Sequence, residues 1–279
     1  MPYRTPTRQR KTANSTTLRV LVAADTVAAT RMTEVLAAYR LCKQFGNVKA
    51  LDQVTFVVHG PALVGILGPN GSGKTTLLDI LEGLSDPTSG EARVLGQPLS
   101  PYPRHRVGAV LQREFVLDRV TVREYAQLFS TLHNVSHGDD RIIKDANLEA
   151  RANVAVERIS GGEAQRLFIA AAGVHDPDLL FLDEPTAHMD PENRERIKAS
   201  LVAMSKSRTV VMATHDLDEA EAICDVVLFL SGGSVRAIGT VKELVDAVPL
   251  ASRDGLRSAY FHYCATQIDA RGDTQGALA

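Results

Sequence analysis

Cysteine and long apolar runs are both scarce in this sequence. Its three cysteines, Cys42, Cys224 and Cys264, are an odd number without C-x-x-C spacing. They predict neither a disulfide framework nor a metal site, and they are typical of a reducing cytosol. No apolar run approaches the ~18 residues that a helix needs to span a bilayer, so we expect the chain not to cross a membrane by itself.

A large net charge is also absent. The formal net charge is -2 over 279 residues, so the overall charge gives no reason to expect nucleic acid as a partner. A content of 44% hydrophobic and 23% charged residues is typical of a globular protein with one large or two small domains. The sequence shows no internal repeat.

The charged residues are unevenly spread. Residues 1–31 carry six basic side chains and one acid, Asp25, a net charge of +5 that leaves -7 on the remainder. We predict a loosely ordered basic extension, with Met32 as an alternative translation start. A mitochondrial-type presequence remains an alternative because the segment is rich in arginine and poor in acids. Its short apolar stretch, residues 18–24, fits a secretory signal poorly.

The most specific pattern is a glycine-rich loop between an apolar run, residues 62–67, and a helical one, residues 76–84. The loop reads GPNGSGKT and matches the phosphate-loop pattern G-x-x-x-x-G-K-[ST] at every fixed position. Its glycines let backbone N–H groups close around phosphate oxygens, and the next helix points its positive end at them. A plain strand-to-helix turn has no need of the Lys-Thr pair. We expect nucleotide contacts from Gly68, Pro69, Asn70, Gly71, Ser72, Gly73, Lys74, Thr75 and Thr76.

The loop also assigns chemistry to single side chains. Lys74 is expected to reach the β- and γ-phosphates, and the Thr75 hydroxyl to hold Mg²⁺. About 110 residues downstream, an apolar strand at 179–182 ends in Asp183 and Glu184. Asp183 suits the Mg²⁺ shell, and Glu184 suits a base that orients or deprotonates the attacking water. An ordinary acidic strand end is the alternative, which the upstream phosphate loop disfavours.

A third pattern is Ser160-Gly161-Gly162-Glu163, just before the apolar helical run at 167–174. Ser-x-x-Glu is a capping box, so starting a helix is one sufficient explanation. A cap does not need two consecutive glycines, which cost helix stability. They are useful where backbone must come close to a phosphate, which is the second explanation.

Strand-like and helical patterns alternate along most of the chain, which favours a mostly parallel sheet covered on both faces. We place a small helical insert at about 113–160 and a polar tail at 249–279. Strands are expected at 38–41, 51–58, 62–67, 91–95, 107–111, 179–182, 209–213, 226–230 and 235–238, and helices at 76–84, 121–134, 192–204 and 217–223.

In order, the phosphate loop, Gln112, the Ser-Gly-Gly signature, the Leu-Asp-Glu-Pro strand and Thr214-His215-Asp216 resemble the nucleotide-binding subunit of an ATP-binding cassette (ABC) transporter. The resemblance covers about residues 33–246. It implies an α/β fold: a phosphate-loop NTPase core with a mostly parallel sheet, an N-terminal antiparallel β subdomain and a small helical insert. The ATPase domain would then cover residues 32–248.

The resemblance also implies roles for further residues. Phe45 would stack on adenine, Gln112 would sense Mg²⁺ and the water, and His215 would touch the γ-phosphate. A turn-flanking Phe, a loop Gln and a structural His are the plain alternatives. The catalytic set would be Lys74, Gln112, Glu184 and His215, and the metal set Thr75, Gln112 and Asp183. Ser160, Gly161 and Gly162 would act on the ATP of a second cassette. Glu163 and Asp190 are also expected in the nucleotide-binding set, and Asp190 would preserve communication across the dimer.

The sequence departs from the family pattern near Asp190. His188 and Met189 stand where a small residue and Leu are usual, Ile159 replaces Leu, and Glu163 replaces a common Gln. We hypothesise that His188 alters cooperativity or makes it pH-sensitive. An unchanged pH profile and Hill coefficient in His188→Gly would remove that hypothesis.

The resemblance implies an ATP-hydrolysing subunit that closes as a dimer around two MgATP and drives a separate membrane permease. Export of the kind seen in bacterial drug, antibiotic and polysaccharide exporters is expected. The protein would be cytoplasmic and peripheral at the inner face of the cell membrane. A soluble non-transport ATPase, acting as an assembly factor or switch, is the alternative. The partner cassette could be identical or different.

Overall fold

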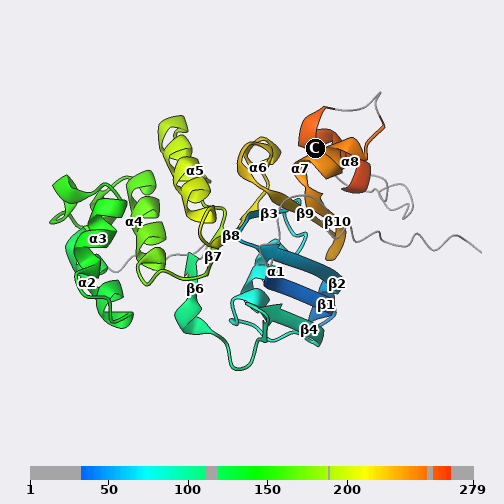
Figure 1. Ribbon diagram of the computed structural model, residues 1–279, viewed down its shortest axis with the longest axis horizontal. Coiled ribbons are helices and arrows are strands. Elements are labelled where there is room, and N and C mark those ends of the chain that lie inside the picture. Colours follow the sequence, from blue (N-terminus) through cyan, green and yellow to red (C-terminus); the bar gives the residue numbers. More distant parts are fainter. Residues whose placement is uncertain (1–32, 111–118, 188, 250–253, 265–279) are drawn as a thin grey trace, which may run out of the picture.

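The computed structural model describes residues 33–110, 119–187, 189–249 and 254–264 (Figure 1). The expectations for residues 1–31, Gln112 and His188 lie outside these ranges. Within them the chain forms two sheets flanked by helices. No helix in the described ranges is long and apolar enough to cross a membrane.

The first sheet is antiparallel and contains the N-terminal hairpin. Strand β1 (Thr33–Phe45) pairs with β2 (Val48–Gly60) and with β4 (Ser89–Val94), which is followed by the short β5 (Gln97–Pro98). In β2 every second residue from 54 to 58 is buried, the alternation expected where one face of a sheet packs on a core. The predicted N-terminal antiparallel subdomain is confirmed.

The second sheet is parallel except at one edge. Its strand order is β10-β9-β3-β8-β7-β6, and only the pair β9–β10 is antiparallel. Strands β3, β7 and β8 are buried along their whole length, which explains their continuous apolar sequences. The strands are β3 (Leu63–Leu67), β6 (Val107–Val110), β7 (Leu179–Asp183), β8 (Thr209–Thr214), β9 (Val226–Ser231) and β10 (Ser234–Thr240).

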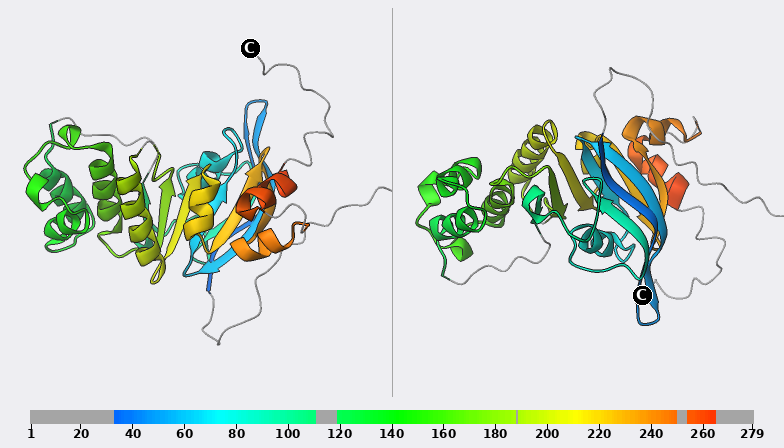
Figure 2. Two further views of the ribbon diagram at one scale, coloured as in Figure 1. Left: turned by 90° about the horizontal axis from the view of Figure 1, so that it is seen from above. Right: turned by 60° about the horizontal axis from the view of Figure 1, so that its bottom comes forward.

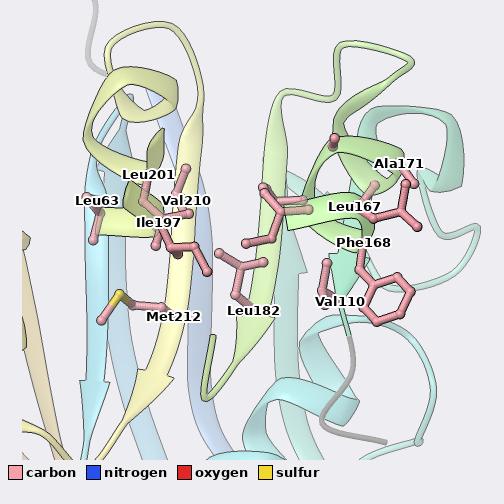
Figure 3. Packing of buried hydrophobic residues seen from close by; sticks show 14 of the residues in the cluster. Leu63, Val110, Leu167, Phe168, Ala171, Leu182, Ile197, Leu201, Val210 and Met212 are labelled. Carbon is pink, nitrogen blue, oxygen red and sulfur yellow. The ribbon is translucent and has the colours of Figure 1, made fainter. Parts of the chain in front are cut away.

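Two cores lie on the two faces of this parallel sheet. Met212 of β8 belongs to the core that contains Ile197 and Leu201 (Figure 3). Its neighbour Val211 belongs to the opposite core, with Leu77 and the antiparallel sheet. The flanking helices are α1 (Lys74–Leu81), α4 (Gly161–Gly173), α5 (Pro191–Ser205), α6 (Leu217–Ile223) and α7 (Val241–Asp246).

The helical insert lies at one end of the molecule, beside α4 (Figures 1 and 2). Helix α2 (Val122–Leu132) begins at Thr121, whose side chain forms a capping box with Glu124. Helix α3 (Gly138–Asp145) packs against α2 and α4. Short 3₁₀ turns stand at Arg104–Arg106, Glu149–Arg151 and Val156–Arg158.

Helix α8 (Gly255–Cys264) falls in the segment that we expected to be a polar tail. Leu256 and Ala259 are fully buried, and the Tyr260 ring meets Phe229 of β9 edge-on, with 5.6 Å between centroids. Apolar residues at helical spacing place one face of α8 on the sheet, although the residues between them are polar. The polar-tail expectation therefore does not describe residues 255–264.

Candidate active site

The phosphate loop joins β3 to α1 through backbone that only glycine accommodates easily. Gly73 has φ +103°, and a Cβ there would stand 2.7 Å from the Ala50 carbonyl oxygen. At Gly68 a Cβ would come within 2.1 Å of the Leu230 oxygen. The glycines therefore serve both the conformation of the loop and its close approach to neighbouring backbone.

A pocket of about 350 Å³ brings the phosphate loop and the acidic strand end together. Its lining confirms the sequence-based expectation that these two motifs, distant along the chain, share one site. The lining residues are Val48, Lys49, Ala50, Asn70, Gly71, Gly73, Lys74, Thr75, Thr76, Asp183 and Glu184.

Lys74 places a buried ammonium group inside the loop. Its Nζ donates hydrogen bonds to the carbonyl oxygens of Gly68, at 2.9 Å, and Pro69, at 3.3 Å. Burial lowers the pKa of Lys74, and the negative charges of Glu184 and Asp183 oppose that shift. A phosphate group in the pocket would add negative charge and stabilise the charged lysine.

Thr75 and Asp183 form the second part of the site. The Thr75 hydroxyl donates to Asp183 Oδ2 at 3.0 Å, and Asp183 is only 7% exposed. Burial raises the pKa of Asp183, so a cation beside it would favour the ionised form. A hydroxyl and a carboxylate are the hard oxygen donors that suit Mg²⁺, and these two residues fit such an ion.

Glu184 follows β7 with an unusual backbone conformation. Its φ is +51°, in the left-handed region that non-glycine residues rarely adopt. Its N–H donates to the Ala213 carbonyl oxygen at 3.0 Å, and its carboxylate accepts from His215 Nδ1 at 2.9 and 3.0 Å. The strand end and the histidine thus hold this carboxylate at the edge of the pocket. Strain of this kind clusters at functional positions.

The signature residues form a separate cluster and do not line this pocket. The Ser160 side chain accepts from the Glu163 N–H, and Glu163 Oε2 accepts from the Ser160 N–H at 2.8 Å. The capping box is therefore present. A Cβ at Gly161 would meet nothing within 4 Å, whereas one at Gly162 would meet Asn193 at 2.6 Å. Close packing against α5 explains Gly162, but nothing in the described chain requires glycine at 161.

Asp190 joins this cluster at the start of α5. Its carboxylate accepts from the Asn193 N–H at 2.9 Å and from Asn193 Nδ2 at 2.6 Å. The Arg166 guanidinium of α4 donates in turn to Asn193 Oδ1. Sequence reasoning missed Asn193 and Arg166, because no motif in this sequence singles them out.

Two further residues bear on the site. The sequence predicts Phe45 as a site residue, and it does not indicate Glu219. Phe45 ends β1, is 54% exposed, and has the Lys43 ammonium 5.0 Å from its ring centroid, but it does not line the pocket. Glu219 is 2% exposed and accepts from the hydroxyls of Thr186, at 2.6 Å, and Thr214, at 3.2 Å. Burial raises the pKa of Glu219. The residues next to Glu219 are acidic, a pattern typical of a solvent-exposed helix. The sequence therefore does not indicate that Glu219 links two loops of the site.

The comparisons with known proteins agree with this arrangement. A family model described as ABC transporter matches residues 51–187. The Nod factor export ATP-binding protein I of Cupriavidus pinatubonensis is 35% identical over 225 residues, which cover 77% of this chain and 69% of that protein. The chain belongs to the ABC transporter family. The cassette is an ATPase that binds ATP and hydrolyses it for transport.

Solved structures place the fold of this cassette among known ATPase subunits. A structure described as the ATP-binding subunit of an ABC transporter has a TM-score of 0.73 and 25% identity, and covers 82% of this chain and 99% of that one. A dimeric post-hydrolysis ATP-binding cassette with ADP and Pi has a TM-score of 0.67 and 27% identity, with 74% and 98% covered. The predicted family, fold class and ATPase activity are confirmed. The roles of single site residues stay predictions.

Proposed function

We propose that this cassette works as one half of a dimer that encloses two ATP molecules and drives export through a separate membrane subunit. The observation that carries the proposal is the pocket in which Lys74, the Thr75–Asp183 pair and Glu184 meet. Support for export comes from relatives named as export ATP-binding proteins, and support for a dimer from a dimeric structural neighbour.

ATP is the substrate, and its phosphates lie in the glycine-rich loop. The Lys74 ammonium, one of whose donors is not used by Gly68 or Pro69, stabilises negative charge on the β- and γ-phosphates. Thr75 and Asp183 would hold Mg²⁺, which would neutralise phosphate charge. Exposed Phe45, at the end of β1, stacks on the adenine ring.

Glu184 prepares the water that attacks the γ-phosphorus. The water oxygen forms a bond to phosphorus while the bond from phosphorus to the β–γ bridging oxygen breaks, and the water proton passes to the Glu184 carboxylate. His215 keeps that carboxylate in position through the Nδ1 hydrogen bonds. When the imidazole is protonated, its Nε2–H is a second donor for the developing negative charge on the γ-phosphate. The products are ADP and inorganic phosphate.

The signature cluster serves the nucleotide of the partner cassette. Gly161 supports this role because the space beside its Cα is open, so a phosphate of the partner's ATP can approach the backbone at the start of α4. Ser160 and Asp190 cap the two neighbouring helices and present their ends to the same interface. Glu163 contributes by holding Ser160 in its capping box.

A membrane-embedded partner is supported by relatives named as export ATP-binding proteins and by a structural neighbour described as part of an ABC transporter complex. We place the cassette at the inner face of the cell membrane, bound to a permease that recognises the cargo. Gln112, next to the helical insert, is the residue that we assign to contact with that permease.

The dimer is tested with Glu184→Gln, a variant that keeps size and hydrogen bonding but cannot accept the water proton as a carboxylate does. Light scattering is recorded with MgATP, with MgADP and without nucleotide. We expect a stable dimer only with MgATP. A monomer under all three conditions would contradict the dimeric mechanism.

A further inference from the structure

A second hollow lies away from the nucleotide pocket, between α4 and α5 and beside the end of α3. Its volume is about 690 Å³, within the range of small-molecule sites, and it shares no lining residue with the nucleotide pocket. Both of its walls belong to helices that start in the signature cluster, since α4 begins at Gly161 and α5 follows Asp190. We call it the α4–α5 groove.

The floor of the α4–α5 groove is apolar. Ile169 and Ala170 of α4 and Ile197 of α5 are buried below it, and Ala203 and Met204 of α5 continue it toward the end of that helix. From Ile197 to Met204 the floor runs for about 10 Å at the rise of an α-helix. A short apolar body fits this length.

Four arginines and one acid, Asp145, line the α4–α5 groove. The arginines at one end have a carboxylate partner, and those at the other end are poorly neutralised. At one end Arg141 meets Asp176 at 2.6 Å, and Arg208 meets the same carboxylate at 3.2 Å. That end is neutralised by its own side chains. An external anion would therefore gain little by binding at this end of the groove.

The opposite end of the groove holds Arg166 and Arg196, whose charges are poorly compensated. Arg166 donates to the carbonyl oxygens of Ala146, at 3.0 Å, and Gly162, at 3.4 Å, and to Asn193 Oδ1, all of them neutral acceptors, and forms no ion pair with any described residue. Among the described residues, Arg196 forms an ion pair with Glu192 alone, a 77% exposed partner on the same helix, and exposed pairs of this kind contribute little. Burial and the charge of Arg196 lower the pKa of Arg166.

We propose that the α4–α5 groove binds a small organic anion, with its charged group between Arg166 and Arg196 and its apolar body on the floor. An anion there relieves the repulsion between the two guanidinium groups and accepts hydrogen bonds from Nη2 of Arg166 and from N–H groups of Arg196 that no described residue uses. The apolar floor adds hydrophobic contact that an inorganic ion lacks. Carboxylate, sulfate and phosphate groups share the required chemistry. The site is independent of the ATP chemistry proposed above.

The test is isothermal titration calorimetry of the full chain with octyl sulfate, kept below its micelle concentration, while MgADP saturates the nucleotide pocket. We expect one octyl sulfate per chain. Octanol, with the same apolar body and no charge, is expected to bind at least 10-fold more weakly, and so is inorganic sulfate, which lacks the apolar body.

Arg196→Gln removes one charge of the pair from an exposed position, so the fold is expected to persist. We expect it to weaken octyl sulfate binding at least 10-fold. Arg93→Gln, on β4 and outside the groove, is the matched control and should bind as the wild type does. Ala203→Glu, which adds a carboxylate to the floor, should weaken binding as strongly. No binding to the wild type, equal binding of octanol, or equal affinity in Arg196→Gln would each overturn the proposal.

Discussion

Buried charged groups set the behaviour of this molecule at the scale of single residues. Burial lowers the pKa of Lys74 and raises the pKa of Asp183. Both side chains line the pocket, where ATP phosphates would stabilise the charged lysine and Mg²⁺ would stabilise the charged aspartate. Glu82, at the end of α1, is 6% exposed, and its Oε2 has no hydrogen-bond partner in the described chain. Burial, with the nearby charges of Asp79 and Asp183, raises the pKa of Glu82 to about 8.

Glu82 therefore predicts a pH-dependent stability. The folded pKa of about 8 lies above the ordinary value of 4.5, so folded Glu82 keeps its proton where the unfolded chain loses it. Its contribution is most favourable below pH 4.5 and is lost as the pH rises to about 8. Over this pH range the contribution of Glu82 to the free energy of unfolding falls by a few kcal/mol in total. We expect Glu82→Gln to lose stability less steeply than the wild type between these pH values.

Urea unfolding at several pH values measures this difference. The buried amide of Glu82→Gln can cost stability at every pH, so the comparison is between slopes and not between single values. Parallel slopes for the two proteins would contradict the assignment of a buried, neutral Glu82.

At the scale of elements, helix caps connect the two helices of the signature cluster. Asn193 joins Asp190, at the start of α5, to Arg166 of α4, and Arg166 reaches on to the Ala146 carbonyl oxygen after α3. These hydrogen bonds link the start of α5 to the helical insert, alongside the packing of α2 and α3 on α4.

We expect Asn193→Ala to lower the free energy of unfolding by about 1–3 kcal/mol, because Asp190 and Arg166 lose a shared partner. Gln127→Ala on α2 is the matched control, since Gln127 is an exposed helical amide, and its effect should stay within about 0.5 kcal/mol. Chemical denaturation measures both. Equal effects of the two variants would show that the Asn193 bridge adds no stability.

The sequence predicts the elements better than the contacts between them. Local sequence is enough to predict the continuous apolar strands β7 and β8 and the glycine-rich loop. Burial restricts the residue types of the strands, and phosphate-loop geometry restricts those of the loop. The bridging contacts of Asn193 and Glu219 could not be found, since Arg166 and Thr186 lie 27 and 33 residues away from them along the chain. Helix α8 was missed because its apolar residues are separated by polar ones. For Gly162 the structure adds a packing reason that the sequence does not contain.

At the scale of the whole molecule, the two sheets and the helical insert form one ATPase whose site is made by distant segments. The nucleotide pocket takes residues from the β1–β2 hairpin region, the phosphate loop and the end of β7. The described lining of this pocket comes from residues 48–184. The basic extension, residues 1–31, is interpreted as a dispensable segment. We expect their deletion to leave the rate of ATP hydrolysis and the melting temperature unchanged.

The deletion is checked by steady-state hydrolysis and thermal melting of the protein that starts at Met32. A shortened protein that folds with the same melting temperature but no longer hydrolyses ATP would assign the basic extension to the catalytic machinery. That result would contradict its interpretation as a dispensable segment.

The central claim is that one pocket, with Glu184 at its edge, hydrolyses ATP. The most direct measurement is the steady-state release of phosphate from ATP by the purified full chain and by Glu184→Gln, with ATP binding measured alongside. We predict that the variant binds ATP as the wild type does and releases phosphate at least about 100-fold more slowly, because the water loses its base. A Glu184→Gln protein that binds ATP and hydrolyses it at the wild-type rate would contradict the account.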